Sequence, residues 1–138
     1  METTRIIVRL KPVPASRARV PRYGKPYYPK TYAEWIAATR ELIPPSDLMI
    51  SFPTEVKVVF GIPRAKTSKL IVPVGDGDNY EKATYDMLTH KGYLMDDKWL
   101  TKGSWSKRFL PYGSLGATVI TLTPDLDPMD ITEKELGL

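Results

Sequence analysis

The chain has 138 residues, 42% hydrophobic and 26% charged, which is the composition expected of one globular domain. It contains no cysteine, and this excludes both a disulfide framework and a thiolate metal site. It also has neither a signal-peptide pattern nor an apolar run that could span a bilayer. The sequence therefore predicts a cytoplasmic protein with no membrane partner.

The net charge is +4, and the charged residues are distributed unevenly along the chain. The segment from Arg9 to Lys30 holds seven basic residues and no acidic one, whereas the segment after Pro124 holds five acidic residues and one lysine. A basic segment in a protein with clustered aspartates is typical of binding to a polyanion. A basic face that is simply solvated would produce the same pattern.

The first half predicts a strand, a long loop, a helix and a second strand. Residues 4–10 are rich in β-branched and aliphatic side chains, and residues 11–30 carry five prolines without helical periodicity. Thr31 and Glu34 have the spacing of a capping box, so we expect a helix from Thr31 to Ile43, stopped by Pro44. Alternation predicts the next strand over residues 55–62.

The second half predicts one more helix and a hairpin. A brief extended segment is expected at residues 70–74. Asp78 with Glu81 then has the pattern of a capped helix that ends before Gly92. Residues 99–109 and 115–122 have the pattern of two paired strands. The order β, α, β, α, β, β predicts an α+β fold, a single domain with a mixed β-sheet and helices packed on it.

Residues 75–98 contain the candidate chemistry, reading GDGDNYEKATYDMLTHKGYLMDDK. Asp76 and Asp78 flank Gly77, and Lys82 follows Asp78 by one helical turn. An acidic pair, Asp96 and Asp97, comes after the helix. We expect these carboxylates to converge at the N-terminus of the second helix.

Carboxylate clusters suit Mg²⁺ or Mn²⁺, which bind oxygen ligands, retain waters and contact phosphate. Hydrolysis of a phosphodiester needs an activated water and neutralised charge. Aspartates also cap helices and occupy turns, so each one taken singly favours a structural role. A calcium EF-hand is excluded because Glu81 and Met87 occupy the positions that require glycine and glutamate.

The motif resembles the signature of the RusA family of Holliday junction resolvases, D-x-D-N-x-x-K-x-x-x-D-x-L followed by a glycine and a D-D pair. The P-x-P at residues 12–14 and the basic, tyrosine-containing loop that follows are similar to the family's N-terminal region. The resemblance covers roughly residues 5–123. Gly77 departs from it, because a bulkier residue is more usual there.

This resemblance implies a DNA endonuclease that resolves four-way junctions by paired symmetric cuts. It implies Mg²⁺ as the cofactor, with Mn²⁺ able to substitute, and a homodimer that binds branched DNA. Members are often encoded by phages, which would place this one in the bacterial host cytoplasm. Residues 1–124 would form the nuclease domain and residues 125–138 an acidic C-terminal tail.

The resemblance also implies roles for individual residues. The metal-binding catalytic carboxylates would be Asp76, Asp78 and Asp97, with Lys82 as the essential lysine. Asn79 and Asp96 would support them.

In the loop of residues 11–30, basic residues alternate with tyrosines, as on surfaces that bind phosphates and stack bases. The candidate DNA-binding residues are Arg17, Arg19, Arg22, Lys25 and Lys30. The tyrosines would equally serve to pack this loop on the domain.

Two other functions remain open at this point. One is a broader structure-selective nuclease that cuts forks and flaps as readily as four-way junctions, since it would use the same carboxylates. The other is a non-catalytic DNA-binding phage protein in which the aspartates only cap helices. The second predicts no requirement for a divalent metal.

Overall fold

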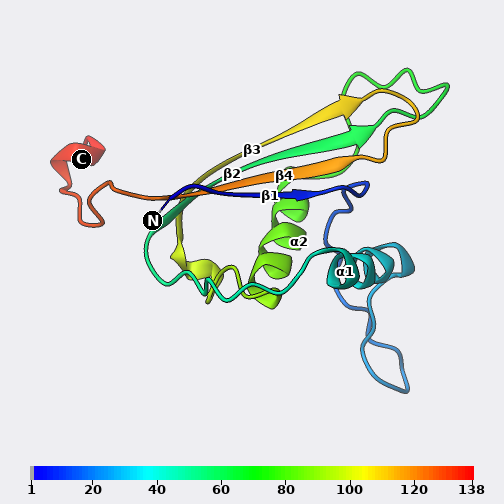
Figure 1. Cartoon of the computed structure of the whole chain (residues 1–138), viewed down its shortest axis with the longest axis horizontal. Coiled ribbons are helices and arrows are strands. Elements are labelled where there is room, and N and C mark those ends of the chain that lie inside the picture. The colour runs from blue at the N-terminus through cyan, green and yellow to red at the C-terminus, as the bar shows by residue number, and fades with distance from the viewer. Residues whose placement is uncertain (1) are drawn as a thin grey trace.

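The computed structural model describes residues 2–138, and in this part of the chain a four-stranded sheet carries two helices on one face (Figure 1). The strands are β1 (Thr4–Val8), β2 (Thr54–Pro63), β3 (Leu100–Leu110) and β4 (Ala117–Pro124). The helices are α1 (Lys30–Leu42) and α2 (Gly77–His90), with short 3-10 turns η1 (Asp97–Trp99) and η2 (Lys134–Leu136). The expected α+β fold with a mixed sheet is confirmed.

The sheet order is β1-β4-β2-β3. Strand β4 is antiparallel to both β1 and β2, whereas β2 and β3 are parallel and α2 connects them. The expected hairpin of β3 with β4 is therefore wrong, because β2 lies between them. Two strand spacings separate β3 from β4 by roughly 10 Å. The connection of residues 111–116 spans that distance readily, at about 3.3 Å per extended residue.

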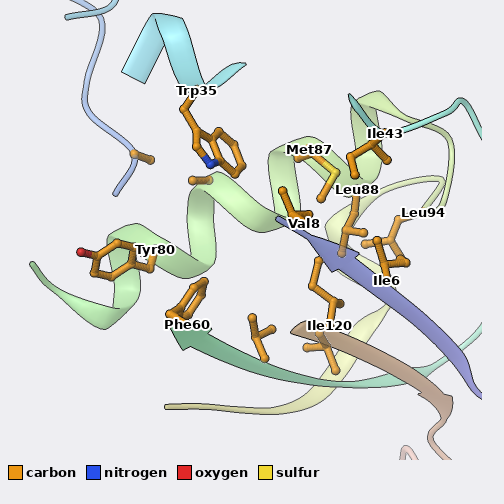
Figure 2. Close-up of a cluster of buried hydrophobic side chains, with 14 of the residues drawn as sticks. Ile6, Val8, Trp35, Ile43, Phe60, Tyr80, Met87, Leu88, Leu94 and Ile120 are labelled. Atoms are coloured by element: carbon orange, nitrogen blue, oxygen red, sulfur yellow. The ribbon is translucent and has the colours of Figure 1, made fainter. Parts of the chain in front are cut away.

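The core lies between the sheet and the helices. Along β2 the side chains of Val56, Val58 and Phe60 are each only 1% exposed. They meet α2 and β4, which contribute the fully buried Leu88 and Ile120. Figure 2 shows Leu88, Ile120 and Phe60 in one cluster with Val8 and Ile6 of β1 and Trp35 of α1.

The opposite face of the sheet is covered by no other element of residues 2–138 (Figure 1). Val59 of β2 pairs with Val119 of β4, and Val119 pairs with Ile7 of β1, so these three side chains form an apolar row. Val59 and Ile7 are exposed. The strands thus follow the two-residue alternation expected when one face is buried and the other meets solvent.

Both expected capping boxes are wrong. Pro29 is the N-cap of α1, so Thr31 already lies inside the helix, and Glu34 pairs with Lys30 at 3.8 Å. Asp76 is the N-cap of α2, and its carbonyl accepts from the amides of residues 79 and 80. Asp78 therefore lies in the first turn, and Glu81 accepts instead from the Tyr85 hydroxyl. The expected extended segment at residues 70–74 forms no strand.

The glycine stop of α2 is confirmed. Gly92 has φ +82° and its amide donates to the Thr89 carbonyl. A Cβ at this position would lie 2.2 Å from the Ser46 carbonyl oxygen. Gly92 is thus required twice, for its left-handed backbone and for the close passage of the segment after α1.

A comparison of two glycine variants separates these requirements. Gly113 also has a left-handed backbone, at φ +89°, but nothing lies within 4 Å of a Cβ added there. We expect Gly113→Ala to lower the free energy of unfolding by about 1 kcal/mol through backbone strain alone. Gly92→Ala should cost at least about 2 kcal/mol, because the Ser46 carbonyl must also move. Urea denaturation measures both, and equal costs would contradict the close packing at Gly92.

Candidate active site

Asp76 and Asp78 lie at the N-terminal end of α2, both with exposed side chains. Asp78 is in the first turn, where the free amides of the helix favour a carboxylate. The Asn79 carbonyl accepts from the Ala15 amide at 2.8 Å. The P-x-P segment at residues 12–14 is thereby tied to the start of the helix that carries the aspartates.

The loop before Asp76 is held by side chains from two other elements. The Lys107 ammonium on β3 donates to the carbonyls of Pro73 and Gly75, at 2.9 and 2.7 Å. The Tyr80 hydroxyl on α2 donates to the Val74 carbonyl at 2.8 Å. Three consecutive carbonyls that precede Asp76 are therefore all hydrogen-bonded.

The four-residue spacing of Asp78 and Lys82 predicts that their side chains lie close together, but Lys82 pairs with Asp86 instead. Its Nζ lies 3.5 Å from Asp86 Oδ2, and within residues 2–138 it forms no ion pair with Asp78. Both partners are at least half exposed, so the pair is weak and water competes for each charge. Lys82 therefore stays available to another anion.

Asp96 and Asp97 follow α2 and begin η1. The Asp96 carboxylate accepts from the Lys98 amide at 2.8 Å, and this hydrogen bond lowers the pKa of Asp96. Asp97 is exposed and borders two grooves. A groove of about 500 Å³ between α1 and α2 also contains Asp86 and Asp96, and one of about 570 Å³ along β3 contains Trp105.

The expected convergence of the carboxylates does not occur within one chain. Among residues 2–138, no three aspartate, glutamate or histidine side chains are close enough to hold a metal ion. Asp76 precedes the first residue of α2. Asp97 borders one groove lined by Asp86 and His90 and another lined by Glu81 and Trp105. The donor chemistry suits a hard divalent cation, but a single chain does not group Asp76, Asp78 and Asp97.

The predicted DNA-binding loop forms a projecting arm. Arg19 and Tyr27 pair through two backbone hydrogen bonds, so residues 19–27 fold back on themselves beside α1 (Figure 1). The Arg22 guanidinium lies 5.6 Å from the centre of the Tyr23 ring. The other basic side chains on or next to the arm are exposed, namely Arg17, Arg19 and Lys25. Lys30 belongs instead to the first turn of α1.

Sequence reasoning missed several residues that surround the aspartates. The pairing of Asp86 with Lys82 is visible from their four-residue spacing. Lys107 and Trp105 gave no local signal, because both reach the loop from β3. Their placement on the helix-covered face follows only once β3 is known to pair in parallel with β2.

No helix in the described residues is long and apolar enough to cross a membrane.

A comparison with curated proteins found none that matches this chain. The family model described as endodeoxyribonuclease RusA matches residues 9–122, which include the arm, all of α2 and the D-D pair.

Nucleases of this family resolve Holliday junctions, bind branched DNA and are generally metal-dependent. The matched region contains the whole motif with its aspartates and lysine unchanged. This chain therefore belongs to the RusA family of crossover junction endodeoxyribonucleases, hydrolases that act on the phosphodiester bonds of DNA.

Proposed function

We propose that the protein is a Mg²⁺-dependent resolvase that cuts four-way DNA junctions by paired symmetric hydrolysis, with Mn²⁺ able to replace Mg²⁺. The observation that carries this proposal is the exposure of Asp76, Asp78, Lys82 and Asp97 on and beside α2, a helix whose other face is core. Charged side chains that are exposed in this way are available to a polyanion and its counterion.

In the proposed site, Asp76, Asp78 and Asp97 hold the ion, supported by Asn79 and Asp96. When bound, Mg²⁺ supplies an activated water and neutralises charge on the phosphate. Lys82 contributes a positive charge to the phosphate, because its exposed pair with Asp86 is easily exchanged for another anion.

We further propose that the protein acts as a homodimer in which two chains complete each site. Asp76 with Asp78 and Asp97 occupy separate places on one chain. In the proposed dimer, Asp97 of one chain lies near Asp76 and Asp78 of the other, and two-fold symmetry then forms two such sites. The same symmetry matches a junction that is cut at two equivalent positions.

Replacement of the Asp97 carboxylate by an amide of nearly the same shape tests the metal site. We expect Asp97→Asn to lower the rate of four-way junction cleavage in Mg²⁺ at least about a hundredfold. Lewis-acid stabilisation is worth several kcal/mol, and 1.36 kcal/mol is tenfold in rate. Junction binding in chelator should persist, and Asp130→Asn in the acidic tail is the matched control. An Asp97→Asn protein that cuts at the unmodified rate would remove Asp97 from the site.

The substrate range is tested with four-way, forked and linear duplexes, each incubated in Mg²⁺ and in chelator. We expect cleavage of the four-way junction at symmetric positions and none in chelator. Equal cleavage of forks would favour the broader structure-selective nuclease instead.

Mixed dimers test whether sites are shared. A dimer of one Asp76→Asn chain and one Asp97→Asn chain retains one intact site if sites are shared, and should nick junctions on one strand. A dimer of one unmodified chain and one chain with both substitutions retains none and should be inactive. Sites contained within single chains predict the reverse for both dimers, so a gel assay of differently tagged, co-purified pairs decides between them.

The arm is tested by removing three of its charges. Replacing Arg17, Arg19 and Arg22 by glutamine should weaken junction binding and reduce the log-log salt slope by about 0.9 per lost phosphate contact. The melting temperature should change little, since all three side chains are exposed. Arg5, Lys57 and Arg108, exposed on β1, β2 and β3, supply a control triple of equal charge. Equal loss of affinity in both triples would show that only net charge matters.

A further inference from the structure

We propose that Lys107 is a positioning residue for Asp76 and Asp78, holding the backbone of the loop that leads into Asp76 and the start of α2. This rests on the proposed function of the two aspartates. Lys107 lies on β3, opposite Phe60 in the register of β2, and so points to the helix-covered side of the sheet. From there its ammonium reaches the carbonyls of Pro73 and Gly75, the latter immediately before Asp76.

The contacts hold the loop from two sides. The Lys107 ammonium donates to the first and third of the carbonyls of residues 73–75, and the Tyr80 hydroxyl donates to the second. The two donors come from different elements, Lys107 from β3 and Tyr80 from α2. Rotation of any of these peptide groups would break a hydrogen bond, and the path of the chain into Asp76 is therefore restricted.

Two glycines on either side of Asp76 complete the arrangement. A Cβ at Gly75, which has φ +104°, would lie 2.8 Å from the Tyr80 ring. A Cβ at Gly77 would lie 2.1 Å from Trp105 Cζ2. The backbone thus rests directly on two aromatic rings, and a side chain at residue 77 would clash with Trp105, two residues before Lys107.

The charge of Lys107 is not used in an ion pair. Within residues 2–138 no carboxylate lies within 4 Å of its ammonium, and both acceptors are backbone carbonyls in a partly buried setting. Its ammonium is therefore committed to the backbone of the loop. A neutral side chain of similar length would lose both hydrogen bonds.

Lys107→Met tests the proposal, with Lys102→Met as the matched control on the same strand, where the lysine pairs with Asp127 in the acidic tail. We expect Lys107→Met to lower kcat for junction cleavage about tenfold and to raise the Mg²⁺ concentration for half-maximal rate about tenfold. Junction affinity in chelator should stay within twofold of the unmodified value. Lys107→Arg should recover most of the rate, and Lys102→Met should change none of these quantities.

Hydrogen exchange gives a readout that is independent of cleavage. Without metal or DNA, Lys107→Met should speed amide exchange in residues 73–80 while β4 exchanges as before. Unchanged exchange there, or an unchanged Mg²⁺ dependence in an active enzyme, would overturn the positioning role. Loss of junction affinity in parallel with rate would identify Lys107 as a DNA contact instead. If the unmodified protein does not cut junctions but Lys107→Met still speeds amide exchange in residues 73–80, the proposed function is wrong. The conclusion that Lys107 restrains this loop is then retained.

Discussion

Burial of one face of β2 is the constraint on which the rest of the structure depends. β2 is paired on both edges, with β4 and with β3, and its helix-facing side chains are almost completely removed from water. Removing any of Val56, Val58 or Phe60 would cost several kcal/mol of transfer and cavity energy. The packing of α2 on this face decides where the helix begins, and therefore where Asp76 projects.

Helix α2 both packs in the core and carries the charged residues of the candidate site. Its inner face supplies Ala83, Met87 and Leu88 to the core, whereas its outer face carries Asp78, Lys82 and Asp86. Charges on the outer face are well hydrated, so they cost little stability and stay free to bind. At the N-terminal end of α2, hydrogen bonds and aromatic contacts fix the backbone that carries these charges.

Local patterns predicted the elements well. The β-branched and aliphatic composition of residues 4–10 located β1, alternation located β2, and Gly92 marked the end of α2, because each signal depends on residues within a few positions of one another. Pairing was harder to predict. The hairpin of β3 with β4 was wrong because a short connection looks the same whether or not another strand lies between its ends.

The family was predictable from the spacing of its motif residues, whereas the arrangement of the candidate site was not. The spacing of the aspartates and Lys82 indicated the family, which the match over residues 9–122 confirms. Their expected convergence failed within one chain because the path from Gly92 to Asp97 has no periodic signal. The contacts of Lys107 were equally hidden, since they join positions 32 and 34 residues apart.

The anchored carbonyls of residues 73–75 have a consequence for how this part of the molecule changes over evolution. Upstream of them, residues 64–72 run over the surface with Leu70, Ile71 and Val72 exposed. Because the chain is fixed again before Asp76, insertions or deletions upstream are absorbed without displacing the aspartates. The stretch of residues 64–72 is thus less constrained in length and composition than the segment into which it leads.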